Sequence, residues 1–284
     1  MKTPRALIDM SGEELREYVT GELGQSAFRA EQIAEWLGRG AEIAEMTNLS
    51  RDLREKLSQS CIVGGAKIVK TLTSQHDDTK KFLFELRDGE LIEGVLMGYR
   101  HGHTLCMSTQ VGCRMGCKFC ASTLDGLVRN LTAGEMLSQI IAVNRALGGG
   151  RHVDNLVLMG SGEPLDNYAE VVSMLRRLND KHGPGIGLRG VSLSTCGLVE
   201  RMDRFSKEGL PVTMCLSLHA PNDELRRQIM PVANAYHVKD AIAALGRYID
   251  ATGRRGIIEY SLIRDFNDSR KCADELAALL RGMR

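Results

Sequence analysis

Three cysteines lie close together near the middle of the chain, at Cys113, Cys117 and Cys120. They form the string CRMGCKFC, in which the aromatic residue Phe119 precedes the last cysteine. Three thiolates on one loop can bind three irons of a cubane [4Fe–4S] cluster and leave the fourth iron without a protein ligand. The spacing therefore predicts an iron–sulfur cluster with one coordination position open to a Lewis-basic cosubstrate.

Two other interpretations of the triplet stay open at this stage. A structural zinc site needs four nitrogen or sulfur ligands, usually in two pairs, and His101 or His103 could supply the missing ligand. The three cysteines could also have come together by chance. The position of the triplet directly after a predicted strand favours the cluster.

Other residues whose side chains could take part in catalysis or binding also follow predicted strands. From about residue 104, short apolar strands alternate with amphipathic helices, which predicts an α/β fold with a parallel sheet, either open or closed into a barrel. In such folds the working residues lie at the carboxyl ends of the strands. Cys113, Glu163, Ser194 and His219 all occupy that position, so we expect them to lie near one another.

The first hundred residues have a different pattern. Residues 12–60 are predicted to be helical, beginning with a capping box at Ser11 and Glu14, and residues 62–98 are predicted to form hairpins around an Asp88-Gly89 turn. A second capping box, at Thr132 and Glu135, opens a helix over 131–147, and a long helical stretch is expected over roughly 222–252. We therefore predict an accessory domain over 1–98 and a core over 99–284.

Composition sets limits on the function. The chain has 284 residues, 43% hydrophobic and 26% charged, with a net charge of only +1, which is typical of a globular protein and not of a strongly basic nucleic-acid binder. No apolar run approaches a membrane span, the N-terminus turns acidic too early for a secretory signal, and clustered cysteines favour a reducing compartment. We expect a soluble cytoplasmic protein. Several basic residues could contact phosphates: Arg114, Lys118, Arg129, Arg226 and Arg227.

Longer strings resemble one protein family over nearly the whole chain. They are TLCMSTQVGCRMGCKFCASTLDGLVRNLT, LVLMGSGEPLDNY, VSLSTCG, CLSLHAPNDELRRQIMPV and IEYSLIRDFND. In these strings the chain is similar to the RlmN/Cfr family of radical S-adenosylmethionine (SAM) RNA methyltransferases, and the segment FRAEQIAEWL…MTNLSRDLREKL resembles the N-terminal accessory domain of that family. The resemblance implies a partial (βα)6-type radical SAM barrel with a small helical accessory domain and a short β linker region.

The resemblance also implies the cofactors and their residues. A [4Fe–4S] cluster would be bound by the three cysteines, and SAM would bind its open iron. Gly162 and Glu163 match a segment that meets the SAM amino group, where a carboxylate can pair with the ammonium. Further SAM contacts match Ser194, Ser217, Leu218 and His219. We expect the remaining cysteines to be structural: Cys61, Cys196, Cys215 and Cys272.

The activity implied is methylation of carbon 2 of an adenine in 23S ribosomal RNA and in transfer RNA. In the family, SAM methylates a cysteine near the C-terminus, and a radical formed from a second SAM activates that methyl group. Glu93 matches the proton acceptor, and Cys106 matches the cysteine that releases the product as a disulfide forms. On the residues alone, Glu93 also fits an exposed strand glutamate and Cys106 a buried strand thiol.

The resemblance implies 23S ribosomal RNA and transfer RNA as partners, an electron donor such as flavodoxin, and no membrane. A Cfr-type enzyme that methylates carbon 8 and a catalytically incomplete RNA-binding fragment are the alternatives. The family continues past the position of Arg284 with another strand and the methyl-carrying cysteine. We therefore expect the chain to lack the C-terminal part of the family and to cleave SAM without methylating RNA.

Overall fold

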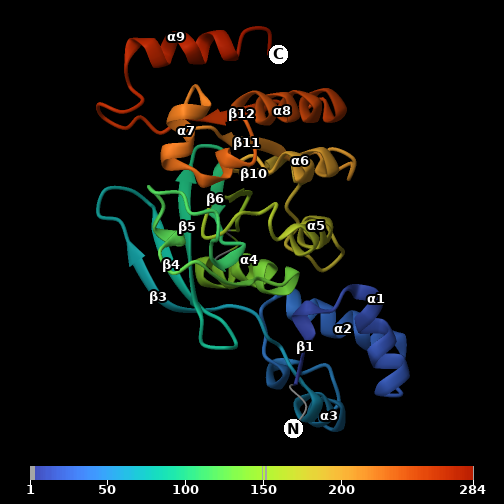
Figure 1. Ribbon diagram of the computed structural model, residues 1–284. Helices are drawn as coiled ribbons and strands as arrows, with labels where there is room; N and C mark the ends of the chain where they lie inside the picture. The colour runs from blue at the N-terminus through green and yellow to red at the C-terminus, as the bar shows by residue number, and fades with distance from the viewer. Residues whose placement is uncertain (1–3, 149, 151, 284) are drawn as a thin grey trace. The chain divides into compact units, whose positions relative to one another are not determined.

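The computed structural model describes residues 4–148, 150 and 152–283 (Figure 1). The chain folds into two compact units. The first unit comprises Met1–Met107, Leu131–Asn155 and Val172–Gly187, and the second comprises Ser108–Asn130, Leu156–Val171 and Leu188–Arg284. The chain therefore passes from one unit to the other five times. The predicted boundary between residues 98 and 99 stays a prediction.

The N-terminal helices of the first unit pack around an apolar core. Ser11 begins the first helix with the predicted capping box, because its hydroxyl accepts from the Glu14 N–H at 3.2 Å and its own N–H donates to the Glu14 carboxylate at 2.7 Å. Leu15, Ile33 and Leu57 are buried in this core. The elements are β1 (Arg5–Ala6), η1 (Leu7–Asp9), α1 (Gly12–Glu17), η2 (Tyr18–Glu22), α2 (Ala27–Gly38), η3 (Ile43–Glu45), α3 (Arg51–Ser60) and β2 (Cys61–Ile62).

An antiparallel meander follows in the same unit. Its strands are β3 (Lys67–Thr73), β4 (Lys80–Glu85), β5 (Leu91–Tyr99) and β6 (Gly102–Cys106). The predicted turn at Asp88-Gly89 joins β4 to β5, where the Leu86 N–H donates to the Glu90 carbonyl at 2.8 Å. Gly89 has a φ of +87°, a conformation that favours glycine. The predicted hairpin is therefore confirmed.

Two later segments complete the first unit. Helix α4 (Ala133–Leu147) begins with the predicted capping box of Thr132 and Glu135, and it contributes Ile141 to the core of the N-terminal helices. The Ser138 hydroxyl accepts from the Ala66 N–H at 2.6 Å. Arg177, the last residue of α5 (Tyr168–Arg177), donates to the Ile8 and Met10 carbonyls at 2.8 and 3.0 Å. The N-terminal helices therefore pack against chain that lies more than seventy residues away in sequence.

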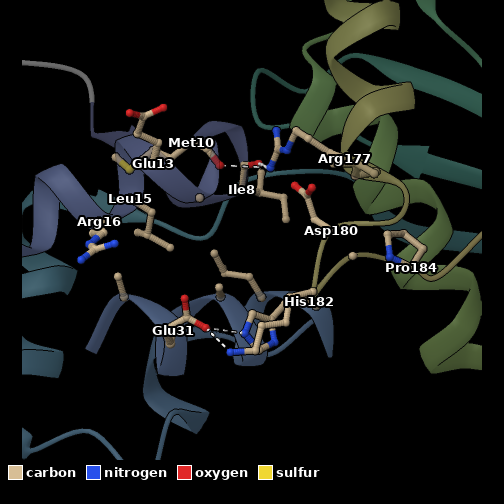
Figure 2. A pocket seen from close by; sticks show the side chains of 18 of the residues that line it. Ile8, Met10, Glu13, Leu15, Arg16, Glu31, Arg177, Asp180, His182 and Pro184 are labelled. Carbon is tan, nitrogen blue, oxygen red and sulfur yellow. Dashed lines mark hydrogen bonds and ion pairs between the residues drawn. The ribbon is translucent and has the colours of Figure 1, made fainter. Parts of the chain in front are cut away.

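A cavity of 590 Å³ lies in the first unit between α1, α2 and the segment after α5 (Figure 2). Figure 2 shows Arg177 directed at the main chain of Ile8 and Met10. His182 lies opposite Glu31, whose carboxylate also binds Lys181 at 2.6 Å. Four of the charged groups that line it thus bind one another or the main chain, namely Arg177, Glu31, Lys181 and His182.

The second unit contains four parallel strands in the order β9 (Asn155–Leu158), β10 (Val191–Thr195), β11 (Thr213–Ser217) and β12 (Gly256–Glu259). Leu193 on β10 lies between Leu158 on β9 and Met214 on β11, and all three are buried. The connecting segments hold η5 (Leu188–Gly190), α6 (Val199–Phe205), α7 (Asp223–Ile229), η6 (Pro231–Asn234) and α8 (Val238–Thr252), and α9 (Arg270–Leu279) follows β12. The predicted α/β class is confirmed.

Two predicted elements are interrupted. The stretch 222–252 is two helices, because α7 ends at Ile229 and Pro231, which has no N–H to donate, begins η6. The strand predicted over 104–112 is divided into β6 and β7 (Gln110–Gly112), and β7 pairs with β8 (Leu127–Asn130). Where β6 and β7 are separated, the N–H groups of Thr109 and Gln110 both donate to the Ser161 carbonyl.

Among the residues described, no helix combines the length and the apolar character that crossing a membrane requires.

Candidate active site

The three cysteines occupy a loop whose main chain is fixed by hydrogen bonds. The Cys113 N–H donates to the Gly126 carbonyl at 2.8 Å, and the Lys118 N–H donates to the Ile229 carbonyl at 2.9 Å. The Thr123 hydroxyl, in η4 (Ala121–Thr123), donates to the Cys120 carbonyl at 2.9 Å. A Cβ at Gly112 would lie 2.0 Å from the Gly126 carbonyl oxygen, so this position requires glycine.

Two of the three thiols, Cys113 and Cys117, lie in an environment that penalises their ionisation. Cys113 and Cys117 are 7% and 8% exposed. Burial raises the pKa of Cys117 to about 12, and repulsion from ionised Cys113, Cys120 and Glu163 adds to the effect. Burial likewise raises the pKa of Cys113. Thiolates at these positions therefore need compensating positive charge, which a bound metal centre provides.

Glu163 is a buried carboxylate held by main-chain donors. Its two oxygens accept from the Leu165 N–H at 3.0 Å and the Cys196 N–H at 2.7 Å. Its own N–H donates to the Gln110 side chain at 2.8 Å. Burial raises the pKa of Glu163, and the hydrogen bonds that it accepts oppose that rise. A cationic ligand beside it would favour the ionised form.

Two serines at adjacent strand ends share a carboxylate that the sequence analysis did not single out. The Ser194 and Ser217 hydroxyls each donate to the Glu259 Oε2 at 2.8 Å, and the two hydroxyl oxygens are 2.9 Å apart. Ser194 is on β10, Ser217 ends β11 and Glu259 ends β12. Parallel pairing of these strands places the three side chains together.

Leu218 and His219 are fixed by the same strand. Their N–H groups donate to the Glu259 carbonyl at 3.0 and 3.2 Å. His219 has a φ of +57°, an uncommon conformation for a residue other than glycine, and its Nδ1 accepts from the Ser261 N–H at 3.1 Å. Burial lowers the pKa of His219. The Leu218 side chain is buried, so its main chain is the part that can face a ligand.

These residues surround one cavity of 500 Å³ in the second unit. The predicted site residues that line it are Cys113, Cys117, Cys120, Gly162, Glu163, Ser194, Ser217 and His219. Phe119 also lines it, with its ring edge against His219 at 5.0 Å between centroids. The convergence expected at the carboxyl ends of the strands is therefore present.

Glu93 and Cys106 lie in the first unit, on neighbouring strands of the meander. Cys106 ends β6 opposite Val95 on β5, and Glu93 precedes Val95 by two residues, so Glu93 and Cys106 share one face of the pair. The Glu93 carboxylate is exposed and lies 2.7 Å from the Lys81 ammonium, while Cys106 is half-buried.

One of the basic residues proposed for phosphate contact is placed differently. Arg226 is fully buried and binds main-chain carbonyls, so the expectation that it meets phosphate is wrong. Arg114 forms a two-pronged ion pair with Asp166, which also accepts from Gln110. Arg227 is exposed.

Sequence reasoning missed Gln110, Glu259 and Arg226 as parts of the site. Glu259 was missed because the strand was predicted over 256–263, which placed Glu259 inside it, whereas the structure ends β12 at Glu259. The burial of Arg226 left no signal in the sequence, because an arginine on a short polar helix is usually exposed to solvent.

Two family models match the chain. One, described as the radical SAM superfamily, covers residues 107–272, and the other, described as the ribosomal RNA large subunit methyltransferase N-terminal domain, covers residues 6–63. The chain is 49% identical over 278 residues to the probable dual-specificity RNA methyltransferase RlmN of Alkaliphilus oremlandii, covering 98% of this chain and 80% of the relative. The chain belongs to the RlmN family of radical SAM proteins.

Other RlmN relatives and a solved structure agree. The probable dual-specificity RNA methyltransferase RlmN of Clostridium perfringens strain 13 is 47% identical over 279 residues, covering 98% of this chain and 80% of the relative. A crystal structure of a radical SAM methyltransferase from Sphaerobacter thermophilus superimposes with a TM-score of 0.93 at 42% identity, covering 99% of this chain and 83% of that chain. The predicted radical SAM fold is confirmed.

The residues present fit the cofactors that a radical SAM fold implies. Within the described residues, no group of three or more His, Cys, Asp or Glu side chains could hold a metal ion. A cubane cluster needs a different arrangement, since three separate irons would each take one thiolate and the thiols need not converge on one ion. Cys113, Cys117 and Cys120 face one cavity and repel one another when ionised, and Glu163 offers a buried carboxylate beside them. This donor set suits an anionic iron–sulfur cluster with a cationic cosubstrate next to it.

Proposed function

We propose that the second unit binds a [4Fe–4S] cluster through Cys113, Cys117 and Cys120 and binds SAM in the same 500 Å³ cavity. The observation that supports this most directly is that three thiols, a buried carboxylate and two strand-end serines line one cavity. When bound, the cluster would supply the electron that cleaves SAM reductively.

The protein groups divide the recognition of SAM between them. Glu163, fixed by two main-chain N–H groups, is suited to pair with the SAM ammonium, and Gly162 lets the main chain approach closely because no Cβ intervenes. Ser194 and Ser217, both bound to Glu259, are suited to polar atoms of SAM, and His219 packs against Phe119 at the rim. Each of these roles is supported by burial and by fixed hydrogen bonds.

We infer that the reaction is methylation of carbon 2 of an adenine in 23S ribosomal RNA and in transfer RNA through a methylcysteine. RlmN relatives are named dual-specificity RNA methyltransferases, which supports both RNA classes. Glu93 would accept the proton and Cys106 would attack the methylcysteine sulfur. Their common face on β5 and β6 supports a joint role, and the ion pair of Glu93 with Lys81 would have to open for proton transfer. An electron donor such as flavodoxin and a cytoplasmic location follow from the same family.

The first experiment measures the cluster. The chain is purified and reconstituted without oxygen, and iron, sulfide, zinc and 5′-deoxyadenosine are assayed. We expect about four irons per chain and SAM cleavage, with both lost in Cys117→Ala and kept in Cys215→Ala, which removes a buried thiol on β11. Zinc in place of iron would contradict the proposal.

A second experiment identifies the product. RNA is incubated with the reconstituted chain, and in parallel with the RlmN relative from Alkaliphilus oremlandii, and the digested nucleosides are mapped by mass spectrometry. Adenine methylated at carbon 2 by either protein supports the proposal. If the chain itself forms it, the expectation that the chain cleaves SAM without methylating RNA is wrong. Methylation at carbon 8 would assign the chain to the Cfr-type reaction instead. RNA that binds while SAM stays intact would favour the non-catalytic alternative.

A further inference from the structure

Arg226 is a buried cation without a carboxylate partner among the residues that the structure describes. Its side chain is 0% exposed. It makes three hydrogen bonds, all to main-chain carbonyl oxygens: Nε to Leu218 at 3.0 Å, and one terminal nitrogen, Nη2, to Cys196 at 2.6 Å and Ser217 at 3.1 Å. The other terminal nitrogen, Nη1, is buried and has no partner in the described structure. A buried charge that lacks a counter-ion is costly, so this arrangement requires an anion nearby.

The cysteine loop is the neighbour that can supply this anion. The Lys118 N–H donates to the carbonyl of Ile229, three residues after Arg226 on α7, and Cys117 and Cys196 share one cluster of buried side chains with Ile229. Arg226 is close enough to Cys117 and Cys196 for the charge of each group to favour ionisation of the other. The charge of Asp223, one turn earlier on α7, also favours the ionised form of Arg226. The two Asp223 oxygens are bound to the Val238 N–H and to His237, and no ion pair joins Asp223 to Arg226 in the part of the chain that the structure describes.

Arg226 lies behind the wall of the SAM cavity. The cavity is lined by Cys117 and Cys196, and the guanidinium binds the carbonyl of Cys196 from the protein side. Arg226 itself does not line the cavity, and it meets the proposed SAM residues Ser217 and Leu218 only at their main-chain carbonyls. A readout taken without SAM therefore separates an effect of Arg226 on the cluster from an effect on SAM binding.

We propose that Arg226 is a positioning and redox-tuning residue, whose buried guanidinium is the fixed counter-ion of the cluster. The inference depends on the proposed cluster. Three thiolates leave an oxidised [4Fe–4S] cluster with net negative charge, and reduction adds one more negative charge. A buried cation stabilises the reduced form more than the oxidised form, so Arg226 raises the reduction potential.

The test compares four proteins: the parent chain, Arg226→Met, Arg226→Lys and Arg227→Met. Arg227 is the adjacent residue on α7, it is exposed, and its charge is screened by solvent, so its substitution is the matched control. Each protein is reconstituted without oxygen, its iron and sulfide are counted, and its potential is measured by a redox titration followed by electron paramagnetic resonance, with no SAM present.

We expect all four proteins to hold the cluster and the Arg227→Met potential to equal that of the parent. Arg226→Met should lower the equilibrium constant for reduction at least tenfold, which is about 59 mV for a one-electron couple. Arg226→Lys keeps the charge but loses the fork of donors, so its potential should lie between the two. A cluster-loaded Arg226→Met protein at the parental potential would overturn the inference, even if its affinity for SAM had changed.

Two outcomes need separate readouts. Parent protein without iron would refute the proposed cluster, whatever Arg226 does. Arg226→Met also leaves three buried carbonyl groups without a donor, so it could fail to fold. In that case the parent itself provides the test: labelling its arginines with nitrogen-15 should give a nitrogen coupling to the reduced cluster in pulsed resonance spectra. This coupling should disappear in Arg226→Lys, and its absence from the parent overturns the inference.

Discussion

At the scale of single residues, two carboxylates of the second unit, Glu163 and Glu259, are held in place by hydrogen bonds. Glu163 is bound by two main-chain N–H groups, and Glu259 is bound by two serine hydroxyls. The second oxygen of Glu259 has no hydrogen-bond partner among the described residues, and Glu259 lines the cavity. Glu259 is therefore both the support of the two serines and a possible acceptor for a hydroxyl of the ligand.

Glu259→Gln should weaken SAM binding, because a neutral amide accepts more weakly from the two serine hydroxyls and offers the ligand an N–H donor where Glu259 offers a second acceptor oxygen. Hydrogen bonds to a charged group contribute about 1.5–3 kcal/mol, so the dissociation constant should rise about tenfold or more. Calorimetric titration of the reconstituted protein with SAM measures the change. Glu224→Gln, at an exposed position on α7, serves as the control. Unchanged affinity in Glu259→Gln would remove Glu259 from the site.

Asp9 provides a test of charge burial in the first unit. Burial raises the pKa of this carboxyl, although the Thr132 hydroxyl that donates to it acts in the opposite direction. A carboxyl whose pKa is raised by folding contributes stability below its unfolded pKa, and that stability is lost as the pH rises through its folded pKa.

Asp9→Asn should therefore become progressively more stable than the parent as the pH rises above the ordinary range of an aspartate. Each unit of pKa difference corresponds to about 1.4 kcal/mol. Urea unfolding of both proteins at several pH values between about 4 and 7 gives the comparison, a window set by the ordinary pKa of Asp near 3.9. A stability difference that does not change with pH would show that the carboxyl is not the cause.

At the scale of elements, short turns at the ends of strands carry the site. Gly162 follows β9 with a φ of +108°, and a Cβ there would lie 2.6 Å from the Gln110 Cβ and 2.9 Å from the Gln110 main-chain nitrogen. Gln110 in turn accepts from the Glu163 N–H. The position of Glu163 thus depends on a glycine immediately before it.

Gly162→Ala is expected to displace Glu163 and to reduce SAM affinity at least tenfold, at a cost in stability of about 1–3 kcal/mol for the strained conformation. Gly246→Ala is the contrasting variant, since Gly246 lies within α8 with open space around it, and alanine there should stabilise the helix by up to about 1 kcal/mol. SAM titration and thermal unfolding distinguish the two. Normal SAM binding by Gly162→Ala would show that the loop tolerates a side chain.

Helix starts and turns could be predicted from the sequence because the residues that determine them are close together in the chain. Capping boxes at Ser11 and Thr132 and the turn at Gly89 each depend on residues within a few positions of one another. The break between α7 and α8 was missed because an amphipathic pattern continued across Pro231. The triad of Ser194, Ser217 and Glu259 spans 65 residues and exists only because three parallel strands are in register. Burial of Arg226 likewise depends on tertiary packing alone.

At the scale of the whole molecule, the first unit is assembled from three separate segments of chain. Ile141 on α4 is 7% exposed and joins the core formed by the N-terminal helices. The predicted accessory domain over residues 1–98 does not include this helix. The stability of the N-terminal helices therefore depends on a segment far beyond the predicted boundary.

Ile141→Ala should lower the free energy of unfolding by about 2–4 kcal/mol, because it removes buried methyl groups and leaves a cavity. Val69→Ala, on β3 of the same unit, should have little effect because Val69 is 50% exposed. Chemical denaturation followed by the fluorescence of Trp36, which packs against this core, reports on the change. Equal stability in the two variants would mean that residues 1–98 form an independent domain.

The repeated passage of the chain between two units has a consequence for its synthesis. The first unit cannot be completed until Gly187 has left the ribosome, so its N-terminal helices must wait while more than one hundred further residues are added. At about 5–20 residues per second, that delay lasts several seconds or more. During this interval the apolar face of the N-terminal helices that α4 later covers is exposed, which makes the nascent chain a candidate for chaperone binding and explains why its order of folding cannot follow its order of translation.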